Sequence, residues 1–126
     1  MLLKVEFEDG KVEELFTDLN DVRGSRNLLL KAVGRDLTLV LKRRFNQIAA
    51  FSTFAALQQS AIGKMEALEG DFMGSYSLRV SANYRLVVKP RCQDLSAACL
   101  KRCDTLIIEG VIDYHGRGKK HNWLIP

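Results

Sequence analysis

The chain has 126 residues, of which 47% are hydrophobic and 27% are charged, and this composition is ordinary for one globular domain with a single core. No apolar run approaches the roughly 20 residues that span a bilayer. The first ten residues also lack the basic end, long apolar middle and cleavage site of a signal peptide. We therefore expect one domain over residues 1–126, located in the cytoplasm.

The net charge of +4 is unevenly distributed along the chain. Residues 1–78 carry ten basic and eleven acidic side chains, whereas residues 79–126 carry nine and four. A local excess of positive charge favours a phosphate-bearing partner. The alternative is that a basic tail only keeps the chain in solution.

The three cysteines, Cys92, Cys99 and Cys103, lie close together in the sequence. An odd count is not typical of a disulfide framework. Their spacing includes no C-x-x-C pair of the kind that holds structural zinc. We therefore expect reduced thiols and no metal.

The N-terminal half predicts a strand followed by helices. Apolar and polar residues alternate over residues 3–8, which indicates a half-buried strand. Asp9 follows at a position where it can cap a short helix. Residues 25–33 are interpreted as one or two further helical turns. The clearest helix covers residues 36–48, where apolar side chains form a continuous stripe and Asp36 is the expected N-cap.

A hairpin is predicted in the second half of the chain. Apolar residues alternate over residues 76–80 and 84–88, and the segment between them is short enough for a tight turn. If the turn centres on Ala82, Arg79 and Arg85 lie opposite each other on one face of the hairpin. Like charges directly across a ladder are destabilising, so such a pair is tolerable in water and useful if both side chains share an anion.

Pro90 ends the second strand of the hairpin because proline cannot donate to a ladder. Residues 91–104 are interpreted as a polar insertion with a short helix at 95–101. A strand over residues 106–115 follows, and residues 116–126 form a basic C-terminal extension. This order predicts an α+β fold, in which the N-terminal strand and the helices pack on one face of a twisted, mainly antiparallel sheet.

The strand over residues 106–115 ends in three polar residues that a hydrophobic core does not require, Asp113, Tyr114 and His115. Histidine titrates near neutral pH and therefore suits acid or base catalysis. In a regular strand Asp113 and His115 share a face, so Asp113 can orient the imidazole. The alternative is that this histidine is structural and that Asp113 only caps the strand end.

The stretch L-E-G-D-F-M-G-S-Y-S-L-R-V-S-A-N-Y-R-L-V-V, followed by a strand that ends I-D-Y-H, resembles the HigB-type killer-protein branch of the RelE/ParE toxin superfamily. The match covers residues 36–88 and 106–115. The resemblance implies a compact RelE-like domain that acts as the toxin of a type II toxin–antitoxin system. It implies a metal-independent endoribonuclease that cuts mRNA on the ribosome, without a cofactor. The implied partners are a HigA-like antitoxin, in a hetero-oligomer, and ribosome-bound mRNA, with no membrane.

The resemblance also implies the residues of the site. The strand end and the hairpin arginine are expected to be catalytic: Arg85, Asp113, Tyr114 and His115. Phosphate contacts are expected from a second hairpin arginine and from the basic tail: Arg79, Arg117, Lys119 and Lys120. Arginine suits this role because its guanidinium can contact phosphate through two N–H groups.

Two glutamates, Glu66 and Glu69, occupy positions where related sequences often have a histidine and a lysine. This difference leaves two alternatives to the nuclease. One is a ParE-like inhibitor of DNA gyrase on the same fold, and the other is a catalytically degenerate module that binds an antitoxin or RNA. In the tail, Trp123 is interpreted either as an anchor of the chain end or as a platform for a base.

Overall fold

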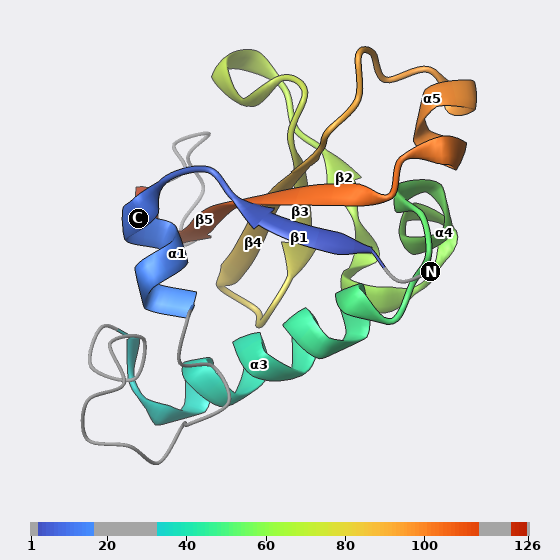
Figure 1. Cartoon of the computed structure of the whole chain (residues 1–126). Coiled ribbons are helices and arrows are strands. Elements are labelled where there is room, and N and C mark those ends of the chain that lie inside the picture. The colour runs from blue at the N-terminus through green and yellow to red at the C-terminus, as the bar shows by residue number, and fades with distance from the viewer. Residues whose placement is uncertain (1–2, 17–32, 114–121, 126) are drawn as a thin grey trace.

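The computed structural model describes residues 3–16, 33–113 and 122–125 (Figure 1). Several sequence predictions fall outside these ranges. They are the helical turns at 25–32 and five site residues: Tyr114, His115, Arg117, Lys119 and Lys120.

The centre of the fold is a six-stranded sheet with the strand order β1-β5-β4-β3-β2, in which β6 also pairs with β5. β1 is parallel to β5, and the other pairs are antiparallel. β1 pairs with residues 105–108 of β5 and β6 pairs with residues 111–113. Because β4 occupies the opposite edge of β5, β1 and β6 share one edge. The strands are β1 (Lys4–Phe7), β2 (Glu66–Ala67), β3 (Tyr76–Arg79), β4 (Tyr84–Pro90), β5 (Thr105–Asp113) and β6 (Asn122–Ile125).

The α-helices of the described ranges are α1 (Gly10–Phe16), α3 (Arg35–Ala49), α4 (Phe54–Gln59) and α5 (Ala97–Arg102), and two 3-10 turns are η1 (Ile62–Lys64) and η2 (Gly70–Phe72). Figure 1 shows α3 running along one face of the sheet. The predicted α+β class, with helices on a mainly antiparallel sheet, is therefore confirmed. Within the described residues, none of these helices has the length and apolar character required to cross a membrane.

The two N-terminal helix caps turn out differently. The predicted cap of α1 is confirmed, because Asp9 Oδ1 accepts hydrogen bonds from the amides of Lys11 and Val12 at 2.9 and 3.0 Å. The predicted cap of α3 is wrong, because Gly34 is the N-cap and Asp36 lies in the first turn. Gly34 adopts φ 86°, which glycine reaches without a Cβ clash, and the Asp36 carboxylate still faces the positive end of the helix dipole.

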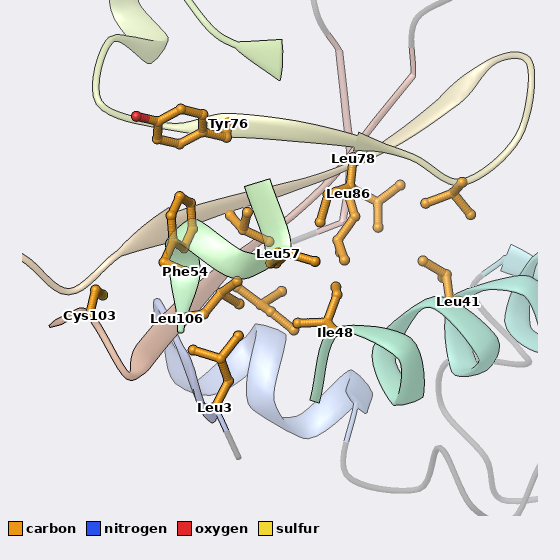
Figure 2. Close-up of a cluster of buried hydrophobic side chains, with 14 of the residues drawn as sticks. Leu3, Leu41, Ile48, Phe54, Leu57, Tyr76, Leu78, Leu86, Cys103 and Leu106 are labelled. Atoms are coloured by element: carbon orange, nitrogen blue, oxygen red, sulfur yellow. The ribbon is translucent and has the colours of Figure 1, made fainter. Parts of the chain in front are cut away.

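The main core lies between α3, α4 and the sheet (Figure 2). Leu41 and Ile48 of α3 are 1% exposed, and Phe54 of α4 is fully buried. The ring of Phe54 packs at 5.2 Å from that of Tyr76, with an interplanar angle of 59°. Full burial of each such side chain contributes about 1.5–3 kcal/mol, so this layer fixes which face of the sheet turns inward.

The hairpin forms as predicted. Arg79 and Arg85 are direct cross-strand partners of β3 and β4. The amides of Val80 and Ser81 both donate to the carbonyl of Tyr84, at 3.0 and 3.3 Å, and close the turn. The like-charged pair is therefore a feature of the fold.

The segments near the C-terminal end differ in part from the prediction. The helix expected at 95–101 is α5, and the hydroxyl of its N-cap Ser96 accepts from the amide of Cys99. The expected basic extension contains β6, which the sequence analysis did not predict. A run of four residues is too short to show a strand period, and its pairing with β5 is a long-range contact.

Candidate functional site

The two faces of the sheet have different roles. Tyr76, Leu78 and Leu86 point into the core beneath α3 and α4. Because side chains alternate along a strand, the intervening residues point to the other face. We call this second surface the arginine face. By the cross-strand register it carries Glu66, Ser77, Arg79, Arg85, Val87, Ile112 and Trp123.

One row of side chains crosses four strands of this face. Arg79 lies opposite Arg85, Arg85 lies opposite Ile112, and Ile112 lies opposite Trp123. Arg79 is exposed and Arg85 is half-buried. Neighbouring strands are about 4.8 Å apart, so the two guanidiniums can contact the same phosphate or adjacent ones.

The side chain of Arg85 is oriented by the turn of the hairpin. Its Nη1 atom donates to the carbonyl oxygens of Ser81, Tyr84 and Ala82, at 2.8, 3.1 and 3.3 Å. A guanidinium has five N–H donors in one plane, so fixing one nitrogen also fixes the direction of the others. The arginine is thus held in place before any ligand arrives, which lowers the entropy cost of binding an anion.

Glu66 is a site candidate that the sequence analysis noted only as a departure from related sequences. It pairs with Ser77 across β2 and β3, which places its exposed side chain on the arginine face. Arg79 is two residues beyond Ser77, so Glu66 and Arg79 are diagonal neighbours, with Cα atoms about 7–8 Å apart. The carboxylate and the two guanidiniums therefore border one region. β2 has only two residues, too few for the alternation that would have revealed this placement.

Glu69 differs from Glu66 in position. It precedes η2 as its N-cap residue, and its side chain makes no capping hydrogen bond. The two glutamates that stood out together in the sequence are therefore not equivalent, and the strand register places only Glu66 on the arginine face.

A second carboxylate reaches the same surface at a β-bulge. The register between β4 and β5 shifts after Val87, which lies opposite Gly110. At this bulge the Glu109 carboxylate accepts a hydrogen bond from the hydroxyl of Ser75. The sequence analysis also missed this contact, because it joins the start of β3 to β5, and β4 lies between these two strands.

Asp113 and Arg85 have different cross-strand partners. Asp113 is the direct partner of Tyr84, and Tyr84 packs against the main core. Arg85 is the partner of Ile112. Adjacent residues of a strand point to opposite faces, so Asp113 and Arg85 leave the sheet on different sides. The catalytic roles of Asp113 and Arg85, like those of the five site residues outside the described ranges, stay predictions.

Trp123 anchors β6 to the rest of the molecule. Its ring packs against Phe72 of η2, with centroids 5.5 Å apart and an interplanar angle of 46°. Val87 and Ile112 are fully buried although they are not part of the main core cluster, so this face has a small apolar layer of its own. The contact favours the anchoring interpretation of Trp123, and the 42% of the residue that remains exposed leaves the interpretation as a base platform untested.

No protein-family model and no curated protein matches the sequence. Among solved structures, the chain is similar to the YoeB/ParE toxin from Agrobacterium tumefaciens, with a TM-score of 0.50 and 14% sequence identity. That alignment covers 90% of this chain and 100% of the toxin. The chain has the fold of a YoeB/ParE toxin. This result confirms the RelE-like fold that the resemblance predicted.

Two structures from Staphylococcus aureus are also similar. The YoeB-YefM complex gives 19% identity and a TM-score of 0.48, and the YoeB dimer gives 18% and 0.48. Each alignment covers 90% of this chain and 98% of the other. The HigB-type subgroup is not among these structures and stays a prediction.

Proposed function

We propose that this chain is the toxin of a type II toxin–antitoxin system and that it cleaves mRNA as an endoribonuclease on the ribosome. The observation that carries the proposal is the arginine pair of the hairpin. Arg79, which is exposed, and Arg85, which is half-buried, are direct cross-strand partners, at a cost in stability that a purely structural hairpin avoids. The YoeB/ParE toxin fold and the basic second half of the chain support the same conclusion.

In the proposed reaction the 2′-hydroxyl of the RNA attacks the adjacent phosphorus. A base removes the hydroxyl proton, and an acid protonates the 5′-oxygen that leaves, so that a cyclic phosphate forms. Glu66 is the proposed base, because it is the carboxylate diagonal to Arg79 on the arginine face. His115, the imidazole that follows β5 in the sequence, is the proposed acid.

The two arginines stabilise the charge that develops on the phosphoryl oxygens. A guanidinium that is already oriented stabilises a transition state without reorganising at the moment of reaction. Arg85 meets this requirement through its three contacts with the turn carbonyls. Arg79, exposed on the neighbouring strand, supplies the second cation. The basic residues Arg117, Lys119 and Lys120 are proposed to hold the RNA strand on either side of the cut.

The proposed protein partner is an antitoxin, HigA-like in the resemblance. The chain offers such a partner a net positive charge and exposed apolar side chains, such as Leu39 on α3, which is 38% exposed. An acidic, amphipathic segment complements both features.

The function can be tested by induced expression in bacteria that lack the antitoxin. Growth and the 5′ ends of mRNA are recorded for the wild type, for Arg79→Ala and for Arg91→Ala. Arg91 is a matched control, because it carries the same charge but pairs with Glu6 across 2.6 Å near the opposite end of β4. The expected result is growth arrest with new mRNA ends in the wild type and in Arg91→Ala, and neither effect in Arg79→Ala.

The acid is tested in the same strain with His115→Ala and with His121→Ala, the chain's other histidine, as its control. Loss of the new mRNA ends in His115→Ala alone is the expected result. Growth arrest of the wild type without new mRNA ends would contradict the nuclease and favour the gyrase inhibitor. No arrest by folded wild-type protein would favour the degenerate binding module.

A further inference from the structure

The connection between β4 and β5 brings three thiols together. The Cys92 thiol donates to the carbonyl of Cys99 at 3.4 Å. The Cys103 thiol donates to the carbonyl of Thr105 at 3.1 Å. Cys103 is buried, whereas Cys92 and Cys99 are partly accessible. The Cys103 thiol also lies 3.7 Å from the carbonyl of Arg91, so the accessible pair differs from the third thiol in its contact with solvent.

The two accessible thiols are electronically unequal. Burial, followed by the contacts with the other two thiols, raises the pKa of Cys92 to about 12. Hydrogen bonds from the Cys92 thiol and from the backbone amide of Asp94 lower the pKa of Cys99. Cys92 therefore keeps its proton and acts as a donor, while the sulfur of Cys99 is the better stabilised thiolate. The thiolate is the form of cysteine that reacts with electrophiles.

We propose that Cys99 is a peroxide-reactive thiol and that Cys92 resolves its oxidised form, so that a Cys92–Cys99 disulfide closes within the connection between β4 and β5. The proposal concerns a modification site and does not depend on the proposed ribonuclease. It rests on the contact of the Cys92 thiol with the Cys99 carbonyl, on the partial access of both residues to solvent and on the burial of Cys103.

The oxidation proceeds in two balanced steps. The Cys99 thiolate attacks one oxygen of hydrogen peroxide and breaks the O–O bond, giving a sulfenic acid and hydroxide, which takes up a proton to become water. The Cys92 sulfur then loses its proton and attacks the Cys99 sulfur, and the departing hydroxide takes that proton as a second water. Two thiols are oxidised to one disulfide, and one peroxide is reduced to two waters.

The test uses the reduced full-length chain and hydrogen peroxide as the probe. After treatment, the remaining thiols are alkylated under denaturing conditions, and the products are located by peptide mass mapping. We expect one intramolecular disulfide between Cys92 and Cys99, with Cys103 recovered as a free thiol. Glutathione at the same concentration serves as the reference for an ordinary thiol.

Two variants separate the steps. Cys92→Ser removes the resolving thiol, so a sulfenic acid should accumulate on Cys99 and be trapped by dimedone. Cys99→Ser removes the reactive thiolate, so peroxide-dependent thiol loss should slow by at least about tenfold. A disulfide that includes Cys103, a disulfide between two chains, or thiol loss no faster than that of glutathione would each overturn the proposal.

Discussion

We expect substitutions of Arg79 and Arg85 to change the free energy of unfolding in opposite directions. Arg79→Gln and Arg85→Gln each remove one charge and keep a long polar side chain, so both relieve the same cross-strand repulsion. Two unit charges about 6 Å apart in water repel by about 0.7 kcal/mol. This value lies within the range of about 0.2–1 kcal/mol for cross-strand pairs. The diagonal Glu66 carboxylate attracts Arg79 and offsets part of this repulsion, so we expect Arg79→Gln to stabilise the fold by about 0.3 kcal/mol.

Arg85→Gln also loses the contacts of the guanidinium with three turn carbonyls. Hydrogen bonds from a charged donor contribute about 1.5–3 kcal/mol, so the net effect is a destabilisation of about 1–2 kcal/mol once the relieved repulsion is included. The two variants should then differ by roughly 1 M in the midpoint of urea unfolding.

Urea unfolding of the wild type and both variants, at low salt and near 1 M salt, measures both effects. Salt screens the repulsion, so the gain in Arg79→Gln should shrink at high salt, while the loss in Arg85→Gln should persist. If Arg79→Gln is destabilised as much as Arg85→Gln, or if its gain does not depend on salt, the assumed repulsion is absent. A stabilised Arg79→Gln that no longer cleaves RNA would indicate that the pair is kept for a ligand.

Three further predictions have controls within the chain. Glu66→Gln should slow the cleavage of ribosome-bound mRNA by the added protein by about a hundredfold or more, as expected for a general base, whereas Glu69→Gln should leave the rate near that of the wild type. Gly63→Ala should lower the free energy of unfolding, measured in urea, by about 1–3 kcal/mol, because φ is +69° and a Cβ would stand 2.9 Å from the side chain of Leu78 in β3. Gly10→Ala has open space around the added Cβ and should change the free energy little. Trp123→Ala should cost about 2 kcal/mol in the same assay, because the ring is more than half buried, and an unchanged midpoint would contradict its anchoring role.

The sequence predicted the elements whose signals are local. The apolar stripe of α3 repeats over four turns, so the predicted 36–48 helix differs from Arg35–Ala49 by one residue at each end. The alternation of apolar residues on both sides of Ala82 predicted the register of the hairpin, and this register pairs Arg79 with Arg85. Periodicity resolves such elements because each one buries a continuous apolar face.

Other parts depend on contacts that no local pattern encodes. The parallel pairing of β1 with β5 joins residues about one hundred positions apart in the sequence, and β2 and β6 are too short to show alternation. The bulge that brings Glu109 to Ser75 shifts the register of β5 before Asp113 is reached. For a site built from several strands, the sequence can therefore predict which types of residue take part. It cannot predict on which face of the sheet each side chain lies, because that depends on the strand registers.

Glu66 illustrates the consequence for function. In the sequence, an acid in place of a histidine suggested a degenerate module, because it removed a basic group from the expected site. The register changes that interpretation, since it places the Glu66 carboxylate diagonal to Arg79 on the arginine face. Glutamate is itself a side chain that serves as a general base. Under the proposed function Glu66 serves as the proton acceptor, so an acid at this position is compatible with catalysis.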